Sequence, residues 1–174
     1  GFHDVCAVLD DGEVSCWGNN GAGQLGIGST LHKGSPQAEI DLGTGRTATA
    51  VAVGIRTVCA VLDDGSVKCW GAGTSGVLGQ GDGTNRGASL ADLGDALLPV
   101  PLGTGRTATA VAVGSTFACA VLDDGSVRCW GENGSGQLGQ GDTTDRGDQP
   151  GELGDALPPI PLGTGRTATA ITAG

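Results

Sequence analysis

Short runs of alternating apolar and polar residues recur along the chain, separated by turns rich in glycine. In the middle of the chain, residues 47–53 (TATAVAV), 58–62 (VCAVL) and 66–70 (SVKCW) have the length and the β-branched composition of strands. A fourth and weaker run lies near residues 97–102 (LLPVPL). No window of the sequence follows the helical period over three turns, so the pattern predicts an all-β chain.

The same pattern occurs three times. Residues 5–28 (VCAVLDDGEVSCWGNNGAGQLGIG) return with few changes at 58–81 and at 118–141. The connecting loop is shorter in the first unit, at 29–41, than in the other two, at 82–101 and 142–161. The repeat divides the chain into units at about residues 1–53, 54–113 and 114–174, with the innermost strand of each next blade expected at 47–53, 107–113 and 167–173.

Four strands in a unit of roughly 50–60 residues are typical of a blade of a β-propeller. We therefore expect an all-β fold of three four-stranded blades. Three blades are too few to close a propeller, and the last innermost strand stands without the rest of its blade. The expected arrangements are a part of a longer propeller, two copies joined into six blades, or a head-to-tail array.

The turn Asp63-Asp64-Gly65 lies between two apolar runs and predicts a β-hairpin. A three-residue loop with Gly65 in the left-handed conformation sets Cys59 opposite Cys69. The same spacing in every unit favours three disulfides: Cys6–Cys16, Cys59–Cys69 and Cys119–Cys129. Free buried thiols remain an alternative, as does a zinc site shared between units with His3 or His32. Disulfides would indicate an oxidising compartment, and so an extracellular or cell-surface location.

The chain is acidic, with a net charge of −10. This charge disfavours binding to nucleic acid or to an anionic membrane surface. The sequence has no apolar run of the roughly 18 residues that a membrane-spanning helix needs, so no membrane insertion is expected. The expected partners are proteins, either further copies of the chain or flanking blades of a longer one.

The segment CAVLDDGSVRCWGENGSGQLGQGD, residues 119–142, resembles the repeat of the regulator of chromosome condensation family. The preceding TATAVAVG resembles the innermost strand of that repeat, and the resemblance covers nearly the whole chain. It implies a β-propeller, usually of about seven four-stranded blades. The paired cysteines and the "CW" sequence resemble secreted or surface members of the family.

The chain departs from the family pattern in two places. A histidine often precedes the cysteine of the second strand, and His3 stands there in the first unit, whereas Arg56 and Thr116 replace it in the others. The linkers of the second and third units are also longer than in the nuclear founder. No motif matches residues for nucleotide exchange, so the resemblance implies a fold rather than a function.

Several side chains are candidates for a binding or modification site. Arg146-Gly147-Asp148 matches an adhesion tripeptide, although a polar loop tip is favoured. Asn133 begins a glycosylation sequon. No cofactor is expected, except that Ca²⁺ is an alternative to a solvated loop for the crowded acids Asp142, Asp145, Asp148, Glu152 and Asp155.

Tryptophan and arginine recur at fixed places in the repeat. Trp17, Trp70 and Trp130 are expected to pack between blades. The segment GTGRTATA contains no phosphate-loop motif. Its arginines, Arg46, Arg106 and Arg166, are therefore expected to pair with loop acids rather than to bind phosphate.

No acid, base and nucleophile recur together, so no catalytic residue and no enzymatic activity are expected. The leading hypothesis is a non-enzymatic, extracellular structural or assembly scaffold. The alternative is a protein-binding module that uses loops 29–41, 82–101 and 142–161, as propeller-type β-lactamase inhibitors of this broad family do. Guanine-nucleotide exchange is a distant third hypothesis.

Overall fold

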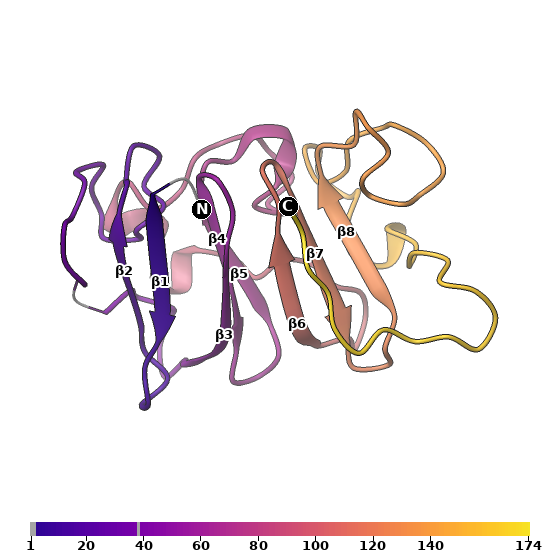
Figure 1. Ribbon diagram of the computed structural model, residues 1–174, viewed down its shortest axis with the longest axis horizontal. Helices are drawn as coiled ribbons and strands as arrows, with labels where there is room; N and C mark the ends of the chain where they lie inside the picture. The colour runs from indigo at the N-terminus through magenta and orange to yellow at the C-terminus, as the bar shows by residue number, and fades with distance from the viewer. Residues whose placement is uncertain (1–2, 38) are drawn as a thin grey trace.

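The computed structural model of the protein describes residues 3–37 and 39–174. Within these ranges, three antiparallel sheets stand side by side in chain order (Figure 1). The first sheet consists of β1 (Asp4–Val8) and β2 (Val14–Gly18). The second consists of β3 (Ala48–Val53), β4 (Thr57–Leu62) and β5 (Val67–Gly71), and the third of β6 (Ala108–Val113), β7 (Phe117–Leu122) and β8 (Val127–Gly131). Single-turn 3₁₀ helices lie in the loops: η1 (Thr74–Gly76), η2 (Leu90–Asp92), η3 (Gly94–Ala96) and η4 (Gly154–Ala156).

The hairpins have the register predicted from their turns. In the second sheet Cys59 lies opposite Cys69, and the Leu62 N–H donates to the Ser66 carbonyl at 2.8 Å. Gly65 closes the turn with a φ of 76°, a conformation that L side chains rarely adopt. Each facing cysteine pair forms a disulfide, with Cα atoms 4.0–4.1 Å apart. The sulfur atoms are therefore unavailable as thiols or as zinc ligands.

The fourth strand expected at 97–102 is not a regular strand. In the described chain one backbone hydrogen bond joins this segment to β5, from the Val100 N–H to the Val67 carbonyl at 2.7 Å. Pro99 and Pro101 flank Val100 and have no N–H, so the segment cannot extend the ladder. An isolated bridge between residues 71 and 86 lies at the other end of β5.

The innermost strand expected at 167–173 is also absent as a strand. The segment begins as its counterparts do, because the Ala168 N–H donates to the Gly125 carbonyl at 2.8 Å. β3 and β6 each pair with the strand that follows them, β4 and β7. Residues 167–173 have no partner strand among the described residues and form no strand there.

Apolar side chains are buried in clusters that combine two consecutive units. The cluster of the first and second units contains Leu25 and Leu42 together with Trp70, Leu93 and Leu97. The cluster of the second and third units contains their counterparts: Leu78, Leu102, Trp130, Leu153 and Leu157. Burial of these side chains supplies most of the force that holds neighbouring units together.

Two of the three tryptophans pack between units as predicted. Trp70 and Trp130 are fully buried, and each indole Nε1 donates to a carbonyl of the preceding unit, that of Gln24 at 3.0 Å and that of Val77 at 2.9 Å. Trp17 differs, because it is partly exposed and makes no indole hydrogen bond within the described residues. Trp17 belongs to the first unit, and the described chain has no earlier unit whose backbone carbonyl could accept its indole N–H.

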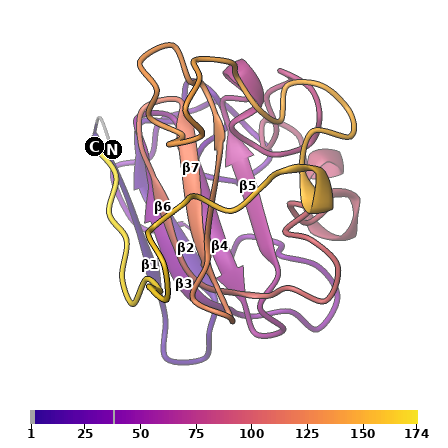
Figure 2. The ribbon, with the colours of Figure 1, turned by 90° about the vertical axis from the view of Figure 1, so that its right-hand side faces the viewer.

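The long loops and the C-terminal segment lie on opposite sides of the sheets (Figure 2). The loops that follow β5 and β8 carry the 3₁₀ helices on one side, and the last residues run past β6 on the other. No helix within the described ranges has the length and hydropathy to span a bilayer. The loop side of the sheets therefore holds most of the irregular structure, and with it the candidate site.

Candidate binding groove

Consecutive units approach each other through glycines. Gly76 of the second unit lies against Gly147 of the third, and a Cβ on Gly76 would come within 2.1 Å of the Gly147 carbonyl carbon. The Gly81 N–H also donates to the Gly147 carbonyl, at 3.1 Å. Gly28 and Gly87 make the equivalent hydrogen bond between the first and second units, at 3.2 Å. The glycine-rich loops thus hold each unit at a fixed distance from the next.

A second contact, which we name the clasp, joins a loop aspartate to the threonine of the LGTGR segment in the preceding unit. Asp95 accepts hydrogen bonds from the Thr44 N–H at 2.9 Å and from the Thr44 hydroxyl at 2.6 Å. Beside them, the Gly94 N–H donates to the Asp41 carbonyl at 3.0 Å. The hydrogen bonds from Thr44 lower the pKa of the Asp95 carboxyl, because they favour its charged form.

The clasp occurs again between the second and third units. Asp155 accepts from the Thr104 N–H at 2.8 Å and from the Thr104 hydroxyl, and these bonds lower the pKa of its carboxyl. The Gly154 N–H donates to the Pro101 carbonyl at 3.0 Å. Both clasps use the sequence Leu-Gly-Asp-Ala-Leu, at 93–97 and 153–157, which loop 29–41 lacks.

A buried cation supports the first clasp. The Lys68 ammonium on β5 donates to the carbonyls of Leu42 and Gly94, both at 2.8 Å, and so joins the two units. Burial lowers the pKa of Lys68, since it disfavours the charged form. Arg128 takes the same place on β8 and donates to the Gly154 carbonyl.

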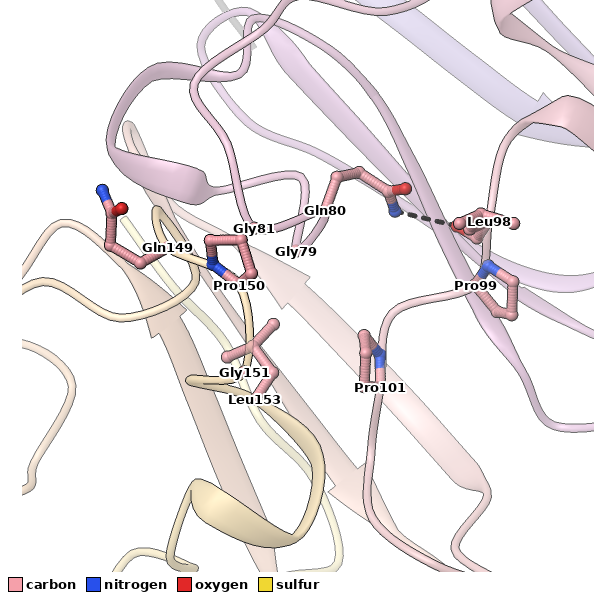
Figure 3. Close-up of a pocket in the computed structure, with 10 residues that line it drawn as sticks. All are labelled: Gly79, Gln80, Gly81, Leu98, Pro99, Pro101, Gln149, Pro150, Gly151 and Leu153. Carbon is pink, nitrogen blue, oxygen red and sulfur yellow. Dashed lines mark hydrogen bonds between the residues drawn. The ribbon is translucent and has the colours of Figure 1, made fainter.

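Between the second and third units these contacts leave a groove of about 250 Å³ (Figure 3). Leu98, Pro99 and Pro101 of loop 82–101 line it on one side, and residues 149–151 with Leu153 of loop 142–161 on the other. Residues 79–81 complete the lining. The Leu98 side chain is 62% exposed and contributes apolar surface to the groove.

The chemistry of the groove suits binding. None of its ten lining residues is ionisable, and its polar side chains are two amides, Gln80 and Gln149. The Gln80 amide donates to the Leu98 carbonyl at 2.8 Å, which fixes one wall (Figure 3). Prolines in both walls limit backbone motion. The arrangement offers a preformed apolar surface and no group for acid–base catalysis.

The acids for which Ca²⁺ binding was the alternative to a solvated loop do not converge. Asp142 pairs with Arg146 at 2.8 Å, and Asp145 accepts from the Asn133 N–H at 2.7 Å. Glu152 accepts from two backbone N–H groups of its own loop, and Asp155 belongs to the clasp. No group of three metal-ligating side chains is found in the described part of the chain. The carboxylates instead fix the loops.

Asn133, which begins the predicted glycosylation sequon, is buried in the loop that follows β8. Its side chain is fully buried, and its Nδ2 donates to the carbonyl and a carboxylate oxygen of Asp142. Its Oδ1 accepts from the Leu138 N–H at 2.9 Å. The sequon is therefore part of a turn whose amide cross-links its own loop, and glycosylation of Asn133 stays a prediction.

The adhesion tripeptide is likewise built into the fold. Arg146 pairs with Asp142, and its backbone bridges to Gly131 at the edge of β8. Gly147 is buried against the second unit, with a φ of 92°. A tripeptide whose glycine is buried cannot present its two charges as a free loop tip.

Two of the basic residues pair with loop acids, and His32 makes a different contact from the one considered for it. Arg46 contacts Asp63 and Asp64 at 3.2 and 2.9 Å, as expected for a residue that pairs with loop acids. Arg106 makes the same contacts with the next hairpin. His32, an alternative zinc ligand, instead accepts the Asn20 N–H on its Nδ1 at 2.8 Å.

The repeated antiparallel sheets, which stand side by side, are typical of a repeat protein of the β-propeller type. The chain matches the regulator of chromosome condensation (RCC1) repeat over residues 11–61 and 64–121, and a second form of that repeat over 48–77 and 108–137. The protein therefore belongs to the RCC1 repeat family, as the resemblance of its sequence implies.

Relatives and solved structures agree with this assignment. The ultraviolet-B receptor UVR8 of Arabidopsis thaliana is 37% identical over 141 residues, which cover 80% of this chain and 30% of UVR8. Human WBSCR16 has a similar fold, with a TM-score of 0.70 at 22% identity over 91% of this chain and 36% of its own. Yeast RCC1 (Prp20), solved bound to Kap60, gives 0.65 at 22% identity over 85% of this chain and 34% of its own. The chain thus spans about a third of each of these proteins.

Proposed function

We propose that the protein is a non-enzymatic binding module that holds an extended, apolar segment of a partner protein in the groove between its second and third units. The observation that carries the proposal is the exposed Leu98 beside the proline walls of that groove. The clasp fixes both walls in advance, which reduces the entropy lost on binding. The crystal structure of the related yeast RCC1 with Kap60 supports protein binding as a use of this fold.

A photo-crosslinking residue at position 98 tests the proposal, with the same residue at position 31 as a control. Leu98 and Leu31 are similarly exposed, at 62% and 68%, but Leu31 lies outside the groove. We expect a protein to be captured from position 98 alone. With that purified partner, Leu98→Ser should weaken binding roughly tenfold, whereas Leu31→Ser should leave it unchanged. Equal capture at both positions, or equal affinity of both variants, would contradict the proposal.

A second candidate function is an extracellular structural scaffold. The contacts between units favour it, because each unit completes a cluster begun by its neighbour. The three disulfides support an oxidising compartment. Alkylation of the protein in its native cells, before any reduction, tests the location. We expect no thiol to be labelled, and labelling of the cysteines would exclude an extracellular site.

A further inference from the structure

The groove between the second and third units has a carboxylate at one end. Asp148 precedes Gln149, which lines the groove, and the Gln149 amide nitrogen lies 3.4 Å from the Asp148 carboxylate. Figure 3 shows Gln149 and the exposed Leu98 on opposite sides of the groove, with Gly81 between them. The groove therefore has an apolar end at Leu98 and an acidic end at Asp148.

Neighbouring contacts fix the backbone at Asp148. The N–H groups of Gly147 and Gln149, on either side of it, both donate to the Glu152 carboxylate, at 2.8 and 3.1 Å. Gly76 of the second unit packs against the same segment, since a Cβ on Gly76 would come within 2.2 Å of the Asp148 nitrogen. The place of Asp148 relative to both walls of the groove is therefore set before a partner binds.

Asp148 lies in no ion pair among the described residues. Loops 82–101 and 142–161, which form the two walls, contain one basic residue each, and both are engaged elsewhere. Arg86 pairs with Asp82, and Arg146 pairs with Asp142, each at 2.8 Å. The whole chain also carries a net charge of −10. A positive charge on a partner would therefore be attracted to this end of the groove.

The contact between units does not require an acid at position 148. At the boundary between the first and second units the equivalent residue is Ala88, and its nitrogen lies against Gly23 as that of Asp148 lies against Gly76. Alanine thus occupies the same backbone position without a charge. The Asp148 carboxylate is therefore not needed to join the units.

The first boundary also lacks the proline wall. Ile40 corresponds there to Val100, because the N–H of each donates to the carbonyl of the first valine of a strand, β2 or β5. Glu39 and Asp41 flank Ile40, whereas prolines flank Val100. In the described chain the proline wall and the aspartate thus occur together, at one and the same boundary, as expected for two parts of one site.

We infer that the partner segment held in the groove carries a lysine or arginine beside its apolar residues, with the apolar side chains against Leu98 and the prolines and the basic side chain at Asp148. The inference rests on the proposed function of the groove and names the class of partner. The apolar contacts provide most of the affinity, whereas the ion pair at the rim sets the direction of the segment and speeds its association. A segment with an acidic residue in that place is repelled.

Selection from a library of random short peptides tests the class of partner. Peptides that bind the immobilised protein are retained, and those that bind the Leu98→Ser variant equally well are discarded because they do not need the groove. We expect the remaining peptides to combine apolar residues with lysine or arginine at one end. Apolar peptides without basic residues would overturn this inference and leave the proposed function standing. If no peptide depends on Leu98, the inference is overturned, and the photo-crosslinking experiment decides the proposed function separately.

Two variants that each remove one negative charge isolate Asp148. Asp148→Asn keeps the shape of the side chain, and Asp10→Asn is the matched control, because Asp10 lies exposed in the first hairpin and in no ion pair of the described chain. For a selected basic peptide, Asp148→Asn should weaken binding roughly threefold to fivefold at about 0.1 M salt, but not at about 1 M, where screening removes the attraction. Asp10→Asn should leave binding unchanged. Equal effects of the two variants, or a loss that persists at high salt, would overturn the inference.

Discussion

Asp95 accepts two hydrogen bonds from Thr44, a residue 51 positions earlier and in a different unit. Asp155 and Thr104 repeat the pair at the same spacing. Neither contact belongs to a sheet or to a hydrophobic cluster. The register between neighbouring units therefore depends on two exposed carboxylates as well as on apolar burial.

Acid should weaken the clasp. Hydrogen bonds from Thr44 hold the pKa of Asp95 below its usual value of 3.8, so at low pH the folded chain binds fewer protons here than the unfolded chain. The stabilisation is complete above about pH 4 and is lost as the pH falls through the lowered pKa. Urea unfolding at pH 5 and pH 3 measures the loss. An Asp95→Ala chain should show a smaller difference between the two pH values, and an unchanged difference would exclude a role for the clasp.

The close approach of glycines predicts a contrast between two substitutions of the same kind. Gly76 and Gly105 both have left-handed φ values, of 74° and 68°, but only Gly76 meets the backbone of another unit. Gly105→Ala should cost about 1 kcal/mol of unfolding free energy, the cost of the conformation alone. Gly76→Ala should cost roughly 3 kcal/mol or more, because the third unit must move. Denaturant unfolding measures both, and equal losses would mean that the units are not in contact here.

The buried ammonium predicts a second contrast. Lys68→Met removes the donor from the carbonyls of Leu42 and Gly94 and should cost roughly 2–3 kcal/mol. Lys68→Arg should cost less than about 1 kcal/mol, because Arg128 serves the equivalent carbonyl in the third unit. The measurement is again the free energy of unfolding. A Met variant as stable as the Arg variant would contradict a stabilising role for the Lys68 ammonium.

The disulfides should stabilise the fold by restricting the unfolded chain, and by more when the loop that they close is longer. Each joins cysteines ten positions apart, and replacing Cys59 and Cys69 together by Ala should cost about 3 kcal/mol. The Cys6 and Cys16 pair closes a loop of the same length and should cost a similar amount. Thermal unfolding of both variants checks the expectation. A loss below about 1 kcal/mol for both pairs would show that the sheets do not need these links.

The hairpins were predictable because their determinants are local. The turn Asp63-Asp64-Gly65 fixes the register of the strands beside it, and the register brings Cys59 to Cys69. The fourth strand at 97–102 was not predictable from apolar content alone, because two prolines remove the donors a ladder needs. Residues 167–173 have the composition of a strand, but a strand also requires a partner.

The candidate site was harder to predict, because its residues contact residues that are distant in the sequence. Asn133 and Arg146-Gly147-Asp148 match short motifs, yet their environment buries the amide and the glycine. The sequence does contain one sign of the clasp, because LGTGR occurs three times whereas Leu-Gly-Asp-Ala-Leu occurs twice. This difference in number is expected if each LGTGR segment contacts the Leu-Gly-Asp-Ala-Leu turn of the next unit. The groove itself arises where two loops meet, and no single stretch of sequence encodes it.

The most direct test of this account compares backbone hydrogen exchange at Thr44, Thr104 and Thr164 in the same chain. The three amides share the sequence Gly-Thr-Gly-Arg, so their intrinsic exchange rates are alike. We expect protection at Thr44 and Thr104, whose amides donate to aspartates, and exchange close to the intrinsic rate at Thr164. Equal exchange at all three positions would contradict it.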